Sequence, residues 1–306
     1  MKSRSDPTGY PLITVYIATK DRCSLLERAV SSVFSQTYPN IELIVSDDGS
    51  RDHTEQYCCD LEKQNNNVVY VRTEVSKGAC YARNRAIEVA RGTFITGLDD
   101  DDEFTPHRVM SLFRQFNPNK YSCIASSVLE RNASGYAYRA SYEGVVDLSL
   151  LLHRNALGNQ VMTLTNRLVK INGFDETFPS FQDYDTWVRL VEAYGLAQKV
   201  AERSYIWHTE HDSEQITRVK EKKIEGLALF VHKHKAKMSS SHMQSMELLE
   251  KKFKNHALSF TEMTRLINTM NYKEAISLFL NSNYPSLKSI IDKIRFWLSH
   301  LLDNTK

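Results

Sequence analysis

The strongest constraint on the fold of this chain is a strand–helix alternation that repeats four times within residues 11–116. Stretches rich in β-branched and aromatic residues, which are typical of buried strands, occupy residues 12–18, 41–46, 68–71 and 94–98. Helical patterns follow them at residues 24–36, 51–64, 78–91 and 106–116. This alternation predicts right-handed parallel crossovers and an α/β fold, in which an open sheet carries helices on both faces.

Four consecutive carboxylates, Asp99 to Asp102, directly follow the fourth expected strand. Because Pro106 suits the first turn of the next helix, the acidic run should lie at the carboxyl end of that strand, where open α/β sheets bind ligands. Crowded carboxylates repel one another and take up protons unless a cation lies among them. A hard divalent cation with oxygen ligands is the simplest solution. The alternative is a solvated acidic turn, but such a turn has no reason to end a buried strand.

Length and composition narrow the class of protein. The 306 residues suffice for one substantial α/β domain with an appendage, and a net charge of only +2 gives no support for nucleic acid as a partner. The five cysteines are an odd set without the spacing of a metal site, which fits a reducing compartment. The polar N-terminus is unlike a signal peptide, and no apolar run reaches the roughly 18 residues of a spanning helix. We therefore expect a cytoplasmic protein, either soluble or peripheral at the inner face of the cell membrane.

The second half of the chain has a different pattern. Strands are expected at residues 121–129 and 197–207, a strand followed by a helix within 161–174, and an amphipathic helix at 183–191. The Gly-, Tyr- and Ser-rich residues 132–144 predict a hairpin or a mobile loop. The last strand leads into a polar cluster that contains His208 and His211.

Residues 214–306 have a helical composition without a convincing strand, so we expect a helical C-terminal region after a domain of residues 1–213. The last expected helix, residues 289–302, combines an apolar face with nearby lysine and arginine residues. Such a helix either packs on its own domain or makes peripheral contact with a membrane.

Six segments in this order resemble the family 2 glycosyltransferases with the GT-A nucleotide-sugar fold, and in particular bacterial enzymes of O-antigen, lipopolysaccharide and capsule synthesis. Residues 19–22 form the loop after the first strand, residues 35–40 precede the second strand, and residues 47–50 are the acidic loop that follows the second strand. Residues 77–86 are a helix start rich in small residues, residues 98–102 are an aspartate-rich metal motif, and residues 181–189 belong to a helix that contains a tryptophan. The resemblance covers residues 11–213. It implies a Rossmann-like, mostly parallel central sheet with a nucleotide-binding half at 11–105 and an acceptor-binding half at 106–213.

Two departures from the family pattern concern the site. Ala18 and Lys20 replace the usual proline and tyrosine of the first loop, which leaves open what stacks on the base. Gln182 replaces the glutamate of a glutamate–aspartate pair, so Asp183 is the carboxylate that remains.

The resemblance implies a metal site and a nucleotide site. Mn²⁺ or Mg²⁺ is expected at Asp99 and Asp101. His208 is expected as a further ligand near the metal or diphosphate, with His211 as the alternative histidine, and the competing interpretation is a histidine of a surface loop. The nucleotide sugar is expected to contact Thr19, Asp21, Asp48 at the uracil N–H, Arg83 at ribose or phosphate, and Asp100 at the ribose or sugar. The alternative for Arg83 is an ion pair at the protein surface.

By the same resemblance, Asp183 is the expected general base, with Asp185 as a fallback. A base is needed because the pKa of an acceptor hydroxyl lies far above neutral. A base on the face opposite the leaving diphosphate implies inversion, which gives a β-linked product from an α-linked donor. The alternative is that Asp183 only caps the following helix.

These expectations describe an inverting hexosyltransferase. It would transfer glucose, galactose or an N-acetylhexosamine from a UDP-sugar to a lipid-linked or lipopolysaccharide/O-antigen acceptor. A nucleotidyltransferase is one alternative, but it would need a glycine-rich phosphate loop, and residues 19–22 contain no glycine. A non-catalytic sugar-nucleotide-binding protein is another, which Gln182 keeps open.

Overall fold

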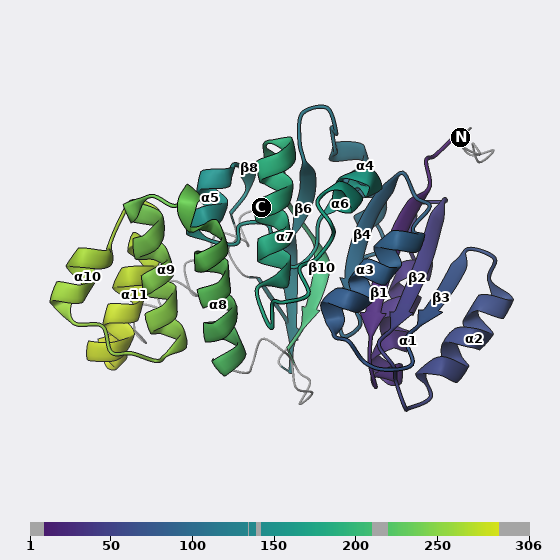
Figure 1. Ribbon diagram of the computed structural model, residues 1–306, viewed down its shortest axis with the longest axis horizontal. Helices are drawn as coiled ribbons and strands as arrows, with labels where there is room; N and C mark the ends of the chain where they lie inside the picture. Colours follow the sequence, from purple (N-terminus) through teal and green to yellow (C-terminus); the bar gives the residue numbers. More distant parts are fainter. Residues whose placement is uncertain (1–8, 134, 139–141, 210–219, 288–306) are drawn as a thin grey trace. The chain divides into compact units, whose positions relative to one another are not determined.

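The computed structural model describes residues 9–133, 135–138, 142–209 and 220–287 (Figure 1). The chain divides into two compact units. Unit 1 comprises Met1–Leu151 and Asn155–Glu214, and unit 2 comprises Leu152–Arg154 and Gln215–Lys306.

Unit 1 alternates strands and helices in its first half, as the sequence predicts. Its strands are β1 (Ile13–Thr19), β2 (Ile41–Asp47), β3 (Val68–Arg72), β4 (Phe94–Asp99), β5 (Glu103–Phe104), β6 (Cys123–Asn132), β7 (Gly135–Tyr138), β8 (Gly144–Val146), β9 (Met162–Leu164) and β10 (Ala197–His208). Its helices are α1 (Cys23–Phe34), α2 (Thr54–Gln64), α3 (Ala79–Val89), α4 (Arg108–Gln115), α5 (Leu148–His153), α6 (Thr165–Lys170) and α7 (Gln182–Tyr194). The last two residues of α5 belong to unit 2.

In the described residues, ten strands form one sheet. Eight of them follow the order β3-β2-β1-β4-β9-β6-β10-β5, while β7 pairs with β6 and β8 pairs with β10. The pairs among β3, β2, β1 and β4 are parallel, as is β6 with β10, whereas β9 is antiparallel to both of its neighbours. The predicted α/β class with a mostly parallel central sheet is confirmed, and β9 joins the two parallel parts.

The residues of β1 show why the sheet is covered on both faces. Tyr16 points to the face where its ring meets the edge of Phe174, with the ring centroids 6.5 Å apart. The alternate residues of the strand point the other way, into the core that includes residues of α1 and α4. These fully buried residues are Ile13, Val15 and Ile17. Because both faces of the strand are apolar, helices must cover both.

The second predicted helix begins later than expected. The sequence pattern indicates a start at residue 51, whereas α2 begins at Thr54. Asp52 provides the physical reason, because its Oδ1 accepts a hydrogen bond from the Thr54 N–H (3.0 Å) and its Oδ2 one from the Cys23 N–H (2.9 Å). One loop carboxylate thus satisfies an N–H group at the start of both α1 and α2.

Unit 2 is helical in its described residues, as its composition predicts. It contains α8 (Lys220–His234), the short 3₁₀ helix η2 (Lys235–Lys237), α9 (Ser240–Phe253), α10 (Phe260–Leu266) and α11 (Tyr272–Asn283). A small hydrophobic core holds the last three helices together and is formed by Leu248, Leu258, Leu266 and Ala275.

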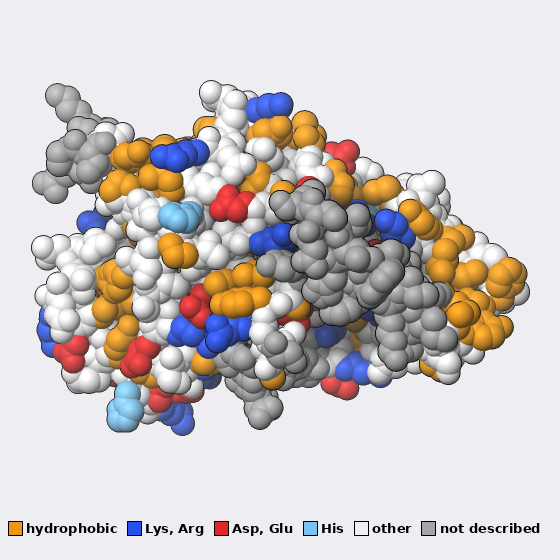
Figure 2. All heavy atoms as spheres, turned by 180° about the vertical axis from the view of Figure 1, so that it is seen from behind, with side chains coloured by type: hydrophobic (Ala, Val, Ile, Leu, Met, Phe, Trp, Pro, Cys, Tyr) orange, Lys and Arg blue, Asp and Glu red, His pale blue; other side chains and the backbone are white. Residues whose placement is uncertain are grey.

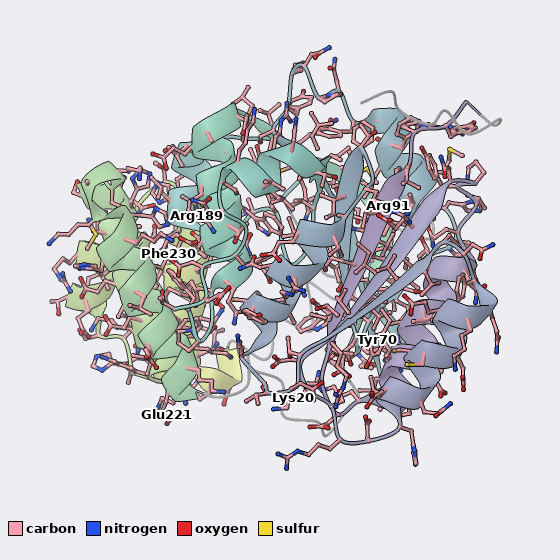
Figure 3. All side chains as sticks on the ribbon, turned by 45° about the vertical axis from the view of Figure 1, so that its right-hand side comes forward. Lys20, Tyr70, Arg91, Arg189, Glu221 and Phe230 are labelled. Carbon is pink, nitrogen blue, oxygen red and sulfur yellow. The ribbon has the colours of Figure 1, made fainter. Side chains whose placement is uncertain are left out.

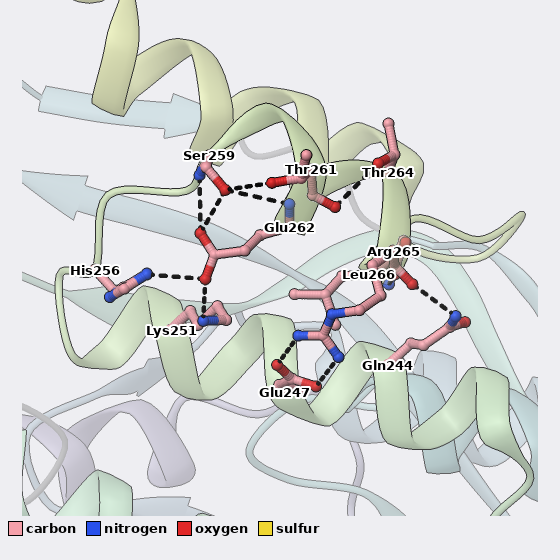
Figure 4. A network of polar contacts seen from close by, with 11 residues as sticks. Gln244, Glu247, Lys251, His256, Ser259, Thr261, Glu262, Thr264, Arg265 and Leu266 are labelled. Atoms are coloured by element: carbon pink, nitrogen blue, oxygen red, sulfur yellow. Dashed lines mark hydrogen bonds and ion pairs between the residues drawn. The ribbon is translucent and has the colours of Figure 1, made fainter.

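A polar network ties α10 to α9 (Figure 4). Ser259 and Glu262 form a reciprocal capping box, in which each side chain accepts a hydrogen bond from the backbone N–H of the other residue. The second carboxylate oxygen of Glu262 lies 2.7 Å from Lys251 Nζ and 3.1 Å from His256 Nε2. One glutamate therefore fixes both the start of α10 and its link to α9.

Hydrophobic side chains gather at one end of the face shown in Figure 2. Among the described residues of unit 2, the exposed large hydrophobic side chains are Phe260, Tyr272, Ile276, Tyr284 and Leu287. Within the described residues, no helix has both the length and the hydropathy needed to cross a bilayer. The expected helix at residues 289–302 lies outside the described residues, as does His211.

Candidate active site

The predicted site residues collect at the carboxyl ends of β1, β2 and β4. Lys20 follows the end of β1, whereas Arg91 precedes β4 and lies at the opposite end of the strands (Figure 3). The loops after β1, β2 and β3 meet at this edge because their strands are parallel neighbours. Ligands of open α/β sheets bind at an edge of this kind.

Asp48 holds the turn that begins α3. Its side chain is buried, and its Oδ1 accepts a hydrogen bond from the Lys77 N–H (2.7 Å). Its Oδ2 accepts hydrogen bonds from the Ser76 hydroxyl (2.6 Å) and from the Gly78 N–H (2.8 Å). A uracil N–H at Asp48 would therefore be added to a carboxylate that already shapes the loop, and this contact stays a prediction.

Asp21 joins the loop after β1 to the loop after β2. Its N–H donates to Ser50 Oγ (2.9 Å), and its Oδ1 accepts from the Arg51 N–H (2.6 Å). Thr19 connects the same loop to the acidic run, because its hydroxyl donates to Asp100 Oδ2 (2.8 Å). The structure thus brings Thr19 and Asp100 together, while the Asp21 carboxylate fixes the loop geometry.

Asp99 ends β4 and is held by three donors from distant parts of the chain. Its Oδ1 accepts hydrogen bonds from Arg83 Nη2 (3.1 Å) and Gln160 Nε2 (3.0 Å), and the Tyr205 hydroxyl lies 3.2 Å from its Oδ2. These donors come from α3, from the loop before β9 and from β10. The carboxylate is therefore a junction between the two halves of the sheet.

Gly97 makes room for this arrangement. A Cβ atom at this position would lie 2.1 Å from Gln160 Oε1 and 2.6 Å from the end of the Tyr16 ring. Gln160 is buried, and its Oε1 accepts a hydrogen bond from the Tyr16 hydroxyl (3.3 Å). A glycine two residues before Asp99 therefore allows Gln160 to reach the Asp99 carboxylate.

One arginine bridges the next two carboxylates. Arg22 Nη1 lies 3.1 Å from Asp100 Oδ1 and 3.4 Å from Asp101 Oδ2. Burial raises the pKa of Asp100 to about 6, with Arg22 opposing the rise and Asp101 adding to it. The acidic run is crowded, as the sequence predicts, and the cation among its carboxylates in this structure is a guanidinium.

The end of the acidic run contacts β10. Asp102 Oδ1 accepts a hydrogen bond from the His208 N–H (2.9 Å), and burial raises the pKa of Asp102, with Asp99 and Asp101 adding to the rise. The ring nitrogen Nε2 of His208 lies 2.7 Å from Glu103 Oε1, and this hydrogen bond lowers the pKa of Glu103. The structure thus pairs His208 with Glu103, and a metal-binding role for His208 stays a prediction.

Arg83 lies between Asp99 and the predicted base. Its Nη2 bonds to Asp99, while its Nη1 lies 4.0 Å from Asp183 Oδ1. Within the described part of the chain, neither of these two facing atoms has a hydrogen-bond partner. Burial raises the pKa of Asp183 to about 7, although Arg83 opposes the rise. A carboxylate of this kind can exchange a proton near neutral pH, as a general base must.

Asp183 and Asp185 differ in environment although both lie in the first turn of α7. Asp185 is fully buried and accepts a hydrogen bond from Arg189 Nε (2.8 Å). Arg189, labelled in Figure 3, also donates to the carbonyl oxygens of Ile171 and Gly173. Asp185 therefore anchors α7, whereas the Asp183 side chain remains 23% exposed. Asp183 also lies inside the helix, not at its N-cap position.

The acidic edge, which is the run Asp99 to Asp102 at the carboxyl end of β4, offers hard oxygen ligands. These ligands do not form a complete metal centre. In the residues that the structure describes, no group of three or more His, Cys, Asp or Glu side chains is placed to hold a metal ion. The donor set nevertheless fits Mg²⁺ or Mn²⁺, because two carboxylates converge on a single cationic nitrogen of Arg22. This pair is Asp100 with Asp101, whereas the Asp99 carboxylate is held by its three donors.

Three residues of this site were not identified from the sequence. Arg22 lies within the recognised segment 19–22, so its charge next to Asp21 was a usable signal. Gln160 and Tyr205 have no such local signal, because a single glutamine in a loop and a tyrosine in a strand are common packing residues. Only the sheet brings them to Asp99.

Residues 14–178 match the family described as glycosyl transferase family 2. Over 274 residues the chain is 34% identical to WcaA of Escherichia coli (strain K12), which is named as a glycosyl transferase of colanic acid biosynthesis, and the alignment covers 86% of this chain and 95% of WcaA. Over 181 residues it is 26% identical to WfgD of Escherichia coli, named as a UDP-Glc:alpha-D-GlcNAc-diphosphoundecaprenol beta-1,3-glucosyltransferase, covering 59% of this chain and 70% of WfgD.

The fold is also similar to a solved structure. It aligns with the crystal structure of TarS 1-349 from S. aureus in complex with UDP-GlcNAc at a TM-score of 0.61 and 18% identity, covering 88% of this chain and 81% of that chain. At this identity the likeness concerns the fold alone. The family match spans more than half of the chain and includes the whole acidic edge, so the protein belongs to glycosyl transferase family 2.

Proposed function

We propose that this glycosyltransferase transfers a hexose from a UDP-sugar to a lipid-linked saccharide with inversion, forming a β-glycosidic bond. The hexose would be glucose, galactose or an N-acetylhexosamine, and the product would be part of a surface polysaccharide such as an O-antigen. The names of WcaA and WfgD support this class of donor, acceptor and product. A lipid-linked acceptor would bring the enzyme to the inner face of the membrane as a peripheral protein.

The observation that carries the proposal is the position of Asp183 relative to the acidic edge. Arg83 contacts Asp99 on one side and faces Asp183 on the other. The Arg83 guanidinium therefore separates Asp183, which is suited to take the acceptor's proton, from Asp99 and its neighbours, which are expected at the donor's diphosphate. A base and a leaving group on opposite sides of the anomeric carbon give single displacement with inversion.

When bound, Mn²⁺ or Mg²⁺ would neutralise the charge that grows on the departing diphosphate. Asp101 would hold the ion together with Asp99 or Asp100, with His208 as a further proposed ligand. The nucleotide would lie over the loops that Asp48 and Asp21 fix, and Thr19 and Arg83 would contact it at the same edge. Asp183 would orient the acceptor hydroxyl and take its proton.

The test uses the full chain, the four common UDP-hexoses and UDP-N-acetylhexosamines, and a saccharide diphosphate joined to an alkyl chain as acceptor. Asp183→Asn keeps the shape of the side chain and removes its charge. Transfer should fall by about 10²- to 10⁴-fold, because that is the usual contribution of a positioned base. Affinity for UDP with Mn²⁺ should stay near the wild-type value, because the base contacts the acceptor and not the nucleotide.

Glu176→Gln is the matched control. This exposed carboxylate accepts a hydrogen bond from Asn84, the residue after Arg83, so the variant removes one charge close to the site without touching the proposed base. It should transfer sugar at close to the wild-type rate. Full activity of Asp183→Asn, or an α-linked product in the NMR spectrum, would contradict the proposal. Binding of UDP-sugars without any transfer would favour the non-catalytic alternative, while family membership removes the nucleotidyltransferase alternative.

A further inference from the structure

We propose that Arg22 is a placeholder for the metal ion. In the free enzyme it neutralises Asp100 and Asp101, and it leaves them for the donor's diphosphate when metal and donor bind together. The inference rests on the proposed function, because it presumes a metal–diphosphate ligand at the acidic edge. It makes Arg22 a positioning residue that couples the metal site to the donor site.

The Arg22 guanidinium lies at the point where two carboxylates converge. A single nitrogen, Nη1, approaches one oxygen of each carboxylate, at 3.1 Å for Asp100 and 3.4 Å for Asp101. The two carboxylate side chains are only 8% and 12% exposed. Charges so poorly solvated are costly without a counter-charge, so a cation at this point stabilises the free enzyme.

The backbone of Arg22 is fixed, but its side chain has access to solvent. The Arg22 carbonyl oxygen accepts hydrogen bonds from the Leu25 and Leu26 N–H groups, both at 3.0 Å, at the start of α1. The side chain is 26% exposed. Arg22 can therefore leave the carboxylates by a change of rotamer, without any unfolding of α1.

The destination of the guanidinium determines the coupling. A divalent ion that binds alone must displace Arg22 from Asp100 and Asp101 and then repel its guanidinium. A diphosphate that arrives with the ion offers phosphate oxygens, which a guanidinium binds in a bidentate manner. Metal and UDP should therefore each increase the affinity of the enzyme for the other, and thermodynamic linkage makes the two factors equal.

Arg28 is the matched control. It lies in α1, which begins directly after Arg22, and its side chain has a similar exposure, 28% against 26% for Arg22. Its contacts include Glu103 and the main-chain oxygen of Asp101. Arg28→Met therefore removes the same charge from the same edge but leaves the bridge over the Asp100 and Asp101 carboxylates in place.

The experiment measures Mn²⁺ binding by electron paramagnetic resonance and UDP binding by calorimetry, each with and without the other ligand, for the full chain. Arg22→Met should bind Mn²⁺ alone more tightly and UDP with Mn²⁺ more weakly. The coupling factor should fall by about tenfold, which is within the roughly 5- to 150-fold range of typical couplings. Arg22→Lys should keep part of the coupling, and Arg28→Met should keep nearly all of it.

Tighter binding of Mn²⁺ alone together with weaker binding of UDP with Mn²⁺ identifies Arg22 as a placeholder, because general damage to the site would weaken the binding of both ligands. The proposal is overturned if Arg22→Met weakens Mn²⁺ and UDP in parallel, leaves the coupling unchanged, or behaves like Arg28→Met. Thermal unfolding of each variant verifies that it is folded. If Arg22→Met does not fold, Arg22→Lys replaces it in the measurements. A wild-type protein that binds neither Mn²⁺ nor UDP would instead refute the proposed function.

Discussion

Gly97→Ala adds one methyl group at the point where the sheet meets the site. The new carbon would lie 2.1 Å from Gln160 Oε1 and 2.6 Å from the Tyr16 ring, well inside van der Waals contact. Tyr16 is buried between the sheet and Phe174, whereas Gln160 presents the end of a rotatable side chain. Gln160 should therefore move first and lose its hydrogen bond to Asp99.

The expected cost has two parts. Overpacking a filled core costs about 1–3 kcal/mol. Loss of a hydrogen bond to a charged group costs about 1.5–3 kcal/mol, and Asp99 keeps its contacts with Arg83 and Tyr205. We therefore expect the free energy of unfolding to fall by about 2.5–6 kcal/mol. UDP binding should weaken as well, because Asp99 loses one of its three donors.

Urea unfolding and calorimetric titration with UDP and Mn²⁺ separate the two effects. Gly92→Ala is the comparison, because its Cβ would lie 2.5 Å from the Thr14 backbone nitrogen, away from Asp99. That variant should lose stability but keep UDP affinity in the folded protein. Combining Gly97→Ala with Gln160→Ala should restore stability and not binding. If the stability losses of these two changes simply add, the clash is not with Gln160 and the reasoning is refuted.

The rate of sugar transfer should fall as the pH drops below about 7, because burial raises the pKa of Asp183 to about 7 and the base must be deprotonated. A pH–rate profile should show this acidic limb in the wild type and not in Asp183→Asn. Asp185→Asn should behave differently, since it leaves the Arg189 guanidinium beside a neutral amide. We expect it to lower the free energy of unfolding by about 2–3 kcal/mol, with far less effect on transfer by the folded protein. Urea unfolding and transfer assays of the two variants provide the comparison.

The acidic edge could be predicted because its signals are local. A buried parallel strand is apolar on both faces, so β1 and β4 are recognisable from a few consecutive residues. The carboxylates that follow Leu98 must then lie at the carboxyl end of this strand, because they directly follow its last apolar residue in the sequence. The strand–helix alternation is equally local, and with the handedness of crossovers it determines the parallel sheet.

The identity of the partners of each carboxylate is a property of the tertiary structure. Asp99 is separated from Gln160 by 61 positions and from Tyr205 by 106. No periodic pattern relates residues that far apart, because periodicity reports only which face of a helix or strand is buried. The sequence pairs Asp99 with Asp101, whereas the folded chain places Arg22 between Asp100 and Asp101.

The two aspartates of α7 show the same division. In the sequence, Asp183 and Asp185 are two carboxylates in one helical turn, and the family resemblance alone ranks them. The folded structure separates them physically, because a helix turns by about 100° per residue and two positions therefore point to different sides. Asp185 points into unit 1 and pairs with Arg189, while Asp183 faces Arg83 at the acidic edge. The sequence alone therefore predicted the parallel strands, their acidic edge and the pair of candidate bases, whereas only packing gives the two aspartates different environments, with Asp185 paired to Arg189 and Asp183 facing Arg83.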